Sequence, residues 1–501
     1  MEKELITNTT IIKILDKYKI LWSLGHVSAL AGWDLETYIP QEGAQARAEA
    51  LSKISSLSQS LFLEKEFVSL IKKADKENLN DFELGIIRLL KRSLDYYEKL
   101  PPEFIEEFVK TTSEATVIWK NAKEKNNFSL FENHLQKIFD LTRKKAEYLG
   151  YVDHPYDALL DEFEEGLTVK EAEEFFTTIK TPLVNLVKYI KKSPKYQQEH
   201  PLEKENYDIE KIKVFSQNLL KFLHDKNDLR IDVSSHPFSA HIGPGDHRIT
   251  TRYLGRDFSR AYSSLIHEFG HALYDIQSNP QLDYSPISGG SSHVIHESQS
   301  RFWENFVAKS SEFIQLIYPD LMQISKSMHK YSVEEIHRYL NLAKPSTIRT
   351  EADEVTYHMH ILIRFELEKG LMEGTIKVKD LPKIWNEKYK AYLGVEPEND
   401  SHGVLQDVHW SNGLIGYFPT YSIGTALSSM WKHSMEKEIG SIQKLLKNKE
   451  GIQKIQNWLK ENIHKYGSTY TFNDLTKRVT NENFNSKYFM NYLEEKYKKL
   501  Y

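Results

Sequence analysis

The sequence predicts a mainly α-helical protein, and three observations support this fold class. Apolar residues recur with the helical period along most of the chain. Glycine and proline are sparse, with 22 and 16 among 501 residues, so few positions break a helix. An alternating apolar and polar pattern is confined to residues 228–255. No segment of roughly 20–50 residues repeats, which argues against a solenoid.

Residues 82–97 illustrate the helical period. In a helix over this segment, one face carries Phe82, Ile86, Leu90 and Tyr97, and most charged residues lie opposite. Other stretches have the same amphipathic pattern. They cover roughly 1–30, 42–75, 103–150, 169–192, 208–225, 297–332, 334–342, 353–371, 434–462 and 486–500.

The predicted organisation is a single domain over residues 1–501. The polar segment Lys191–Tyr207 contains two prolines and predicts a solvated loop. It separates an N-terminal helical layer, roughly 1–190, from a central part, roughly 208–425, which C-terminal helices, roughly 426–501, follow.

Residues 228–255 predict a small antiparallel hairpin or sheet. Leu229–Val233 alternates, the Gly243-Pro-Gly-Asp246 run indicates a turn, and His247–Tyr253 resumes an extended pattern. The next segment predicts a helix, so the sheet is expected directly ahead of it. The free backbone edge of such a strand can pair with an extended peptide.

Composition excludes several classes of partner and site. Lys and Arg number 66 against 71 Asp and Glu, a net charge of −5, so no net positive field draws nucleic acid or anionic lipid. Cysteine is absent, which leaves His with Asp or Glu as ligands for a transition metal. The start, MEKELITN, lacks the apolar core of a signal peptide, and no apolar run of about 18 residues occurs. We expect a soluble cytoplasmic protein.

The segment SLIHEFGHALYD contains a His-Glu-x-x-His motif. Chance produces such a motif in a chain of this composition with a probability of roughly 0.08, so its context must decide. On a helix His267 and His271 share one face and can bind one ion, while Glu268 can address a water on it. Catalytic zinc takes three protein ligands, and Glu297 in the HES segment is the best third candidate. Asp275 is either a partner for the free ring nitrogen of a ligand histidine or an ordinary surface acid.

Three further clusters concentrate polar and aromatic residues. Arg349 lies in IRTEAD, His409 in GVLQDVHW, and Tyr417 and Tyr421 in GYFPTY. Each has an ordinary structural explanation as an exposed arginine, a loop histidine or aromatic core residues.

Six motifs in order resemble the carboxypeptidase Taq family of metallopeptidases. They are His236-Pro-Phe238, Asp246-His-Arg-Ile-Thr250, His267-Glu-Phe-Gly-His271, His296-Glu-Ser-Gln-Ser300, Ile348-Arg-Thr-Glu-Ala-Asp353 and Gly403-Val-Leu-Gln-Asp-Val-His-Trp410. Trp33-Asp34 with Thr37 and Pro40, and Tyr156-Asp-Ala-Leu-Leu-Asp161, extend the likeness over nearly the whole chain. Asp275 stands where this family usually has Glu.

The resemblance implies a neurolysin-like helical body with a deep active-site groove, and a homodimer that removes single residues from peptide C-termini. One Zn²⁺ per chain, with Co²⁺ as an alternative, would be held by His267, His271 and Glu297, with Glu268 as general base. His409 and Tyr421 are the expected donors to the oxyanion, with Tyr417 in reserve.

An exopeptidase must also bind a terminal carboxylate, which a planar guanidinium does by paired hydrogen bonds. Arg349 is the first choice for this role and Arg248 the second. Two alternatives remain open: a helical oligopeptidase that cuts internal bonds, which needs no such arginine, and a catalytically silent binding module, against which the intact motif counts. The expected substrates are peptides with a free C-terminus.

Overall fold

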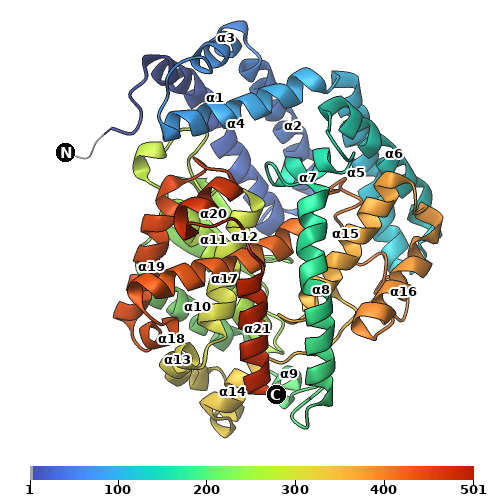
Figure 1. The fold of residues 1–501 in the computed structure, drawn as a ribbon, viewed down its shortest axis with the longest axis vertical. Coiled ribbons are helices and arrows are strands. Elements are labelled where there is room, and N and C mark those ends of the chain that lie inside the picture. Colours follow the sequence, from blue (N-terminus) through green and yellow to red (C-terminus); the bar gives the residue numbers. More distant parts are fainter. Residues whose placement is uncertain (1–3) are drawn as a thin grey trace. The chain divides into compact units, whose positions relative to one another are not determined.

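The computed structural model describes residues 4–501, so the first three residues of the predicted stretch 1–30 lie outside the described part. The chain is mainly helical, as predicted (Figure 1). The amphipathic face expected over residues 82–97 is largely buried, with Ile86, Leu90 and Leu94 each at most 3% exposed. In the described part, no helix is long and apolar enough to cross a membrane.

The chain forms two compact units, each built from three segments. Unit 1 comprises residues up to 94, 199–340 and 431–484, and unit 2 comprises 95–198, 341–430 and 485–501. The boundary at 198/199 falls inside the predicted loop 191–207. The boundaries at 94/95 and 430/431 fall inside single helices, α4 (Asp81–Lys99) and α17 (Pro419–Ile439), and those at 340/341 and 484/485 fall between helices.

Unit 1 contains the sheet and the helices around it. Its helices are α1 (Thr9–Thr37), α2 (Ala44–Phe62), α3 (Lys65–Ala74), most of α4, α9 (Pro201–Lys204), α10 (Ile209–Leu223), α11 (Phe258–Ile276), α12 (His293–Arg301), α13 (Ser311–Ile324), α14 (Val333–Leu340), the second part of α17, α18 (Ile442–Leu445), α19 (Lys449–Asn462) and α20 (Phe472–Thr480). A π-helical segment, η3 (Phe302–Ala308), directly follows α12.

The sheet is mixed, which corrects the predicted antiparallel arrangement. Its order is β1 (Leu229–Val233), β3 (Asp246–Thr251), β2 (Ser239–Gly243). Strands β2 and β3 form the expected antiparallel hairpin, but β1 pairs with β3 in parallel. Since β1 and β2 lie on opposite sides of β3, the link 234–238 crosses the end of β3. Its five residues are long enough, because they reach about 16 Å when extended and two strand spacings need only about 10 Å. Alternation reveals strands but not their neighbours.

Helix α11 packs against strands β2 and β3 and against α12. Gly270 permits the close contact with α12, because a Cβ there would lie 2.6 Å from Ser300 Cα and 2.7 Å from the Gln299 carbonyl oxygen. Any larger residue would push the two helices apart. Figure 1 shows α11 and α12 side by side. The backbone contact therefore brings together the two helices that carry the predicted metal ligands.

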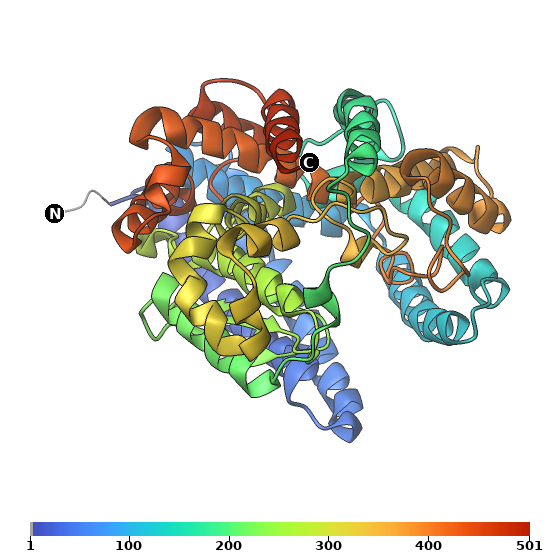
Figure 2. The ribbon, with the colours of Figure 1, turned by 90° about the horizontal axis from the view of Figure 1, so that it is seen from below.

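Unit 2 consists of helices and loops, with no strand among its described residues. Its helices are the end of α4, α5 (Pro102–Glu124), α6 (Ser129–Leu149), α7 (Asp157–Phe163), α8 (Val169–Lys192), α15 (Tyr357–Glu373), α16 (Leu381–Leu393), the start of α17, and α21 (Lys487–Leu500). Helices α5 and α6 pack side by side (Figure 2), and α21 packs along α8 (Figure 1).

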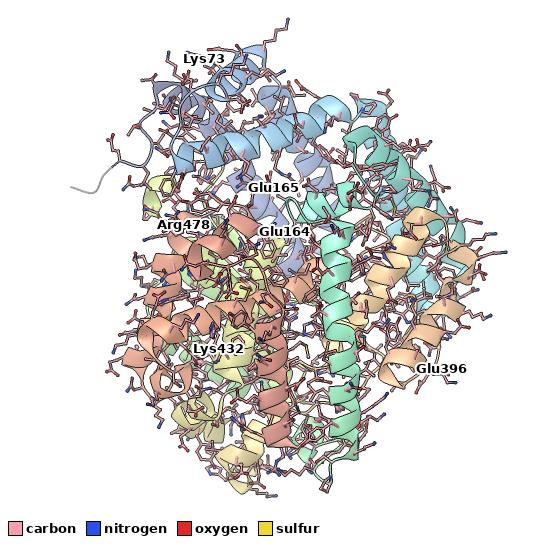
Figure 3. The ribbon with its side chains drawn as sticks, viewed as in Figure 1. Lys73, Glu164, Glu165, Glu396, Lys432 and Arg478 are labelled. Carbon is pink, nitrogen blue, oxygen red and sulfur yellow. The ribbon has the colours of Figure 1, made fainter. Side chains whose placement is uncertain are left out.

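Charged side chains occupy the outer faces of the helices, as the amphipathic pattern predicts. Lys73 on α3 is 65% exposed, and the guanidinium of Arg478 on α20 lies 5.0 Å from the Tyr466 ring and 4.9 Å from the Tyr470 ring (Figure 3).

Candidate functional site

Helix α11 places the three central residues of the His-Glu-x-x-His motif. It begins after Asp257, whose left-handed backbone (φ 49°) is a conformation that Asp tolerates. Asp257 accepts hydrogen bonds from Ser259 and Tyr339, both at 2.5 Å. These contacts stabilise the start of the helix on which His267 and His271 lie one turn apart, with ring centroids separated by 5.0 Å.

His267, His271 and Glu297 form a group whose ligand atoms all lie within 4.8 Å of one another. Glu297 Oε2 is 3.7 Å from Nε2 of each histidine. Ligand atoms of a tetrahedral ion with bonds of about 2.1 Å lie about 3.4 Å apart. Two imidazoles and a carboxylate at this spacing fit a divalent transition metal.

Glu297 is positioned by its own helix. Its Oε1 accepts a hydrogen bond from Arg301 Nε at 2.6 Å, and its Oε2 accepts one from the Ser300 hydroxyl at 3.3 Å. Glu297 is 5% exposed. The arginine holds Oε1 while Oε2 faces both histidines, so the carboxylate is oriented before any ion binds.

Sequence reasoning missed Glu304, which lies in the π-helical segment η3. Its Oε2 accepts hydrogen bonds from His267 Nδ1 at 3.0 Å and from Arg301 at 2.9 Å, and Lys309 binds its Oε1 at 2.8 Å. A carboxylate on Nδ1 fixes the tautomer that leaves Nε2 free for a metal. π-Helical turns are often found at functional sites, but their widened register conceals them from the helical period.

The carboxylates beside His267 create a negative electrostatic potential at its ring. Burial alone would lower the pKa of His267, but Glu297 and Glu304 raise it above the ordinary value. Burial holds the pKa of His271 well below its ordinary value, so this ring is neutral near pH 7. The pocket therefore favours a bound positive charge, and one of its imidazoles is already in the metal-binding form.

Glu268 lies on the same helix and is 7% exposed. Burial raises the pKa of its carboxyl to about 7, partly opposed by His267. A carboxyl group with a pKa near 7 can both accept and return a proton at neutral pH.

The structure places His296 between His271 and Asp275. His271 Nδ1 is 3.3 Å from His296 Nδ1, and His296 Nε2 is 3.6 Å from Asp275 Oδ1, which accepts a hydrogen bond from the Gly290 amide at 2.8 Å. If His271 used Nε2 as a ligand, its Nδ1–H would donate to His296, whose own proton would face Asp275. Asp275 therefore faces His271 only through His296 and is not its direct hydrogen-bond partner.

Arg248 on β3 already has a carboxylate partner. Its Nε and Nη2 donate to the two carboxylate oxygens of Asp246 at 2.8 and 2.7 Å, and its guanidinium lies 4.2 Å from the Trp33 ring. Both the fork and the face of this guanidinium are in use, so another carboxylate would have to displace Asp246.

Unit 2 contains a buried cluster of two arginines and one aspartate. Arg349 Nε donates to Asp407 Oδ1 at 2.8 Å, and Arg364 Nε donates to Oδ2 at 2.7 Å. Burial alone would raise the pKa of Asp407, but the two guanidinium groups hold it well below its usual range. Because two guanidinium groups share one carboxylate, the cluster has one excess positive charge. Arg364 is fully buried and Arg349 is 8% exposed, so Arg349 is the more accessible member.

His409, Tyr417 and Tyr421 lie together near this cluster. His409 Nε2 is 3.4 Å from the Tyr421 hydroxyl, and the His409 ring centroid is 5.6 Å from that of Tyr417. Arg349 lies 5.5 Å from the Tyr421 ring. Burial and the Arg349 charge lower the pKa of His409 to about 3, so this ring is neutral at pH 7. Its buried Nδ1 has no hydrogen-bond partner among the described residues.

Two other predicted motifs converge on a residue that sequence reasoning did not select. Glu368 accepts hydrogen bonds from the Tyr156 hydroxyl, from Trp410 Nε1 at 2.7 Å and from the Gly416 amide at 2.9 Å. The Trp410 contact links the GVLQDVHW loop to α15. Tyr156 and Trp410 therefore have structural partners, and no signal in the sequence marked Glu368.

Unit 1 thus brings together His267, Glu268, His271 and Glu297, and it also contains Arg248. Unit 2 brings together Arg349, His409, Tyr417 and Tyr421.

Known proteins resemble this chain over its whole length. The family model described as carboxypeptidase Taq (M32) metallopeptidase matches residues 13–497. Thermostable carboxypeptidase 1 of Pyrococcus furiosus is 45% identical over 499 residues, covering 99% of this chain and all of that protein. Carboxypeptidase 1 of Bacillus subtilis is 36% identical over 492 residues, covering 97% of this chain and 98% of that protein.

Solved structures show the same fold. A carboxypeptidase structure from Pyrococcus furiosus gives a TM-score of 0.97 at 45% identity, covering 99% of this chain and 100% of the other. The M32 carboxypeptidase of Deinococcus radiodurans R1 gives 0.94 at 29% identity, covering 98% and 99% of the two chains. The chain therefore belongs to the carboxypeptidase Taq (M32) family of metallopeptidases and is a metal-dependent carboxypeptidase, a hydrolase.

Proposed function

We propose that the enzyme removes single amino acids from the free C-termini of peptides, with zinc at His267, His271 and Glu297. One observation carries the proposal: two imidazoles and a pre-oriented carboxylate lie within ligand distance of one point, where neighbouring carboxylates raise the pKa of His267, beside the buried carboxyl of Glu268. When bound, a divalent metal there would polarise the scissile carbonyl and make an attacking water more acidic. Zinc suits this donor set, and cobalt is the alternative.

Glu268 is the proposed general base. Its carboxylate accepts a proton from the attacking water and returns it to the leaving amine. Its burial supports this role, because a carboxyl group with a pKa raised to about 7 can hold the proton between the two transfers.

His409 and Tyr421 are the proposed donors to the oxyanion, with Tyr417 in reserve. The Tyr421 O–H is the group that donates, and a neutral His409 donates from the ring nitrogen that carries its proton. The lowered pKa of His409 supports a neutral donor.

Arg349 is the proposed partner of the terminal carboxylate. The excess positive charge of its cluster supports this role, because the single Asp407 carboxylate is shared with Arg364. Arg248 is the weaker candidate, since Asp246 already binds both arms of its fork.

Mass spectrometry of a peptide digested by the purified enzyme tests the proposal. We expect residues to leave one by one from a free C-terminus, little reaction with the C-terminally amidated peptide, and loss of activity with a chelator. Internal cuts in the amidated peptide at a comparable rate would instead support an oligopeptidase.

We further propose that the protein works in the cytoplasm as a homodimer, with neither nucleic acid nor membrane as a partner. The net charge of −5 is consistent with the absence of those two partners. Sedimentation at micromolar concentration tests the dimer, and a single species with the mass of one chain would contradict it.

A further inference from the structure

A second group of metal-ligand residues lies in unit 1. It consists of His241 on β2, His247 on β3 and Asp275 on α11, whose ligand atoms all lie within 4.8 Å of one another. We propose that this group binds a second divalent transition metal ion, which joins the β2–β3 hairpin to the helix of the catalytic motif. The proposal goes beyond the peptidase activity and does not depend on it.

The spacing of the two imidazoles fits a shared ion. His241 Nδ1 and His247 Nδ1 are 3.2 Å apart, and the ring centroids are 4.7 Å apart with a tilt of 56°. Two ligands of a tetrahedral ion lie about 3.4 Å apart for bonds of about 2.1 Å. The 3.2 Å spacing of these two nitrogens is as close to that value as the 3.7 Å between Glu297 Oε2 and each imidazole of the first group.

The surroundings of this group are buried and contain further acidic residues. His247 is 4% exposed and the Asp275 side chain is 9% exposed, so an ion here would be shielded from water. The carboxylates of Asp228 and Asp283 act electrostatically on the rings of His247 and His241, respectively. A divalent ion would find acidic groups beyond its ligands, as metal sites in proteins usually provide.

The donor set selects the class of metal. Two imidazoles and one carboxylate suit zinc, cobalt or nickel, whereas calcium and magnesium prefer oxygen ligands. A simple hydrogen bond between the two rings would also explain 3.2 Å. That alternative does not explain why Asp275, which belongs to a different element, lies within reach of both rings.

The position of the second group suggests what it does. Its ligands come from two strands and from the last turns of α11, so an ion would fasten the sheet to this helix. Asp275 also faces His296, and His296 faces His271 of the first group. We therefore expect metal at the second group to raise the midpoint of thermal unfolding and to hold Asp275 in place behind the catalytic histidines.

Metal stoichiometry tests the proposal. The purified full-length protein is stripped with a chelator, dialysed against Zn²⁺ and analysed by native mass spectrometry. We expect two ions per chain in the wild type, one each in His241→Asn, Asp275→Asn and Glu297→Ala, and none in the double variant His241→Asn, Glu297→Ala. Asp275→Asn keeps an oxygen that can accept the Gly290 amide, and His241 is only half buried, so both variants preserve the fold.

His224→Gln is the matched control. His224 hydrogen-bonds to Asp228 in the same region but belongs to neither group, so this variant should keep two ions. Titration with Co²⁺, followed by its visible absorption, gives a second count that does not depend on mass spectrometry. One ion in the wild type, or two in His241→Asn, would overturn the proposal and leave a hydrogen-bonded histidine pair.

Discussion

The predicted metal ligands in unit 1 and the arginine cluster in unit 2 are both buried groups of charges, but their excess charges have opposite signs. In unit 1, when His267 is neutral, as metal binding requires, and Glu268 is ionised, the carboxylates of Glu268, Glu297 and Glu304 outnumber the cations Arg301 and Lys309. In unit 2 the guanidinium groups of two arginines share one carboxylate, that of Asp407.

This difference indicates what each group is built to bind. An unbalanced buried charge is costly unless a partner neutralises it. In that protonation state the first group has one excess negative charge, which favours a divalent metal, and the second group has one excess positive charge, which favours a peptide carboxylate.

Replacing Glu268 with Gln should reduce kcat by 10² or more while the metal stays bound, because the amide keeps the shape but cannot accept the proton. Turnover and metal content are measured on the same preparation. Near-normal turnover would remove Glu268 from the mechanism.

Replacing Arg349 with Ala should lower kcat/KM on free-carboxylate peptides. The expected loss of transition-state binding is on the order of 2–5 kcal/mol, the scale for truncating one partner of a buried charge pair. The slow reaction of an amidated peptide should change little. Arg248→Ala is the control and should have the smaller effect on the free peptide. Equal slowing of both peptides by Arg349→Ala would make its role structural and pass the carboxylate hypothesis to Arg248.

Replacing Glu304 with Gln should lower metal affinity about 10- to 100-fold, because His267 Nδ1 loses its charged acceptor. Competition with a chromophoric chelator measures this affinity. Glu312→Gln, on the neighbouring α13, is the control and should retain the wild-type value. Unchanged affinity in Glu304→Gln would show that Arg301 and Glu297 alone orient the site.

Replacing Glu368 with Gln should destabilise the protein by about 1–3 kcal/mol, because both carboxylate oxygens accept hydrogen bonds and a Gln NH₂ group would face a donor. Urea unfolding measures the change. Glu173→Gln, at an acid whose side chain is 48% exposed, should stay within about 0.5 kcal/mol of wild type. An equal effect of both substitutions would show that the buried contacts contribute nothing specific.

Much of the candidate site could be predicted because its signals are local. The spacing of His267 and His271 follows from the geometry of one helix, and Glu297 was found because the HES segment opens another. The helical period likewise predicted the buried face of α4, where Ile86 and Leu90 are in the core. Each of these inferences requires only a few neighbouring residues.

Glu304, Glu368 and the second group were not predicted, because their contacts form only when the chain is folded. Glu304 reaches His267 only because the chain after Arg301 widens into a π-helix. The partners of Glu368 come from segments more than 200 residues away on one side and about 40 on the other. His241 and His247 look like two strand histidines until the hairpin pairs them and α11 brings Asp275 to them.

The sequence by itself therefore determined the helical class, the metal-binding motif and the family, because these depend on residues at fixed short spacings. Only the tertiary structure decided which strand lies beside β3 and which carboxylate orients His267. It also decided that Arg349, and not Arg248, belongs to a group with excess positive charge. Those outcomes depend on contacts between distant segments. Close approach, as at Gly270, and burial set the energies of such contacts, and neither can be read from a linear pattern.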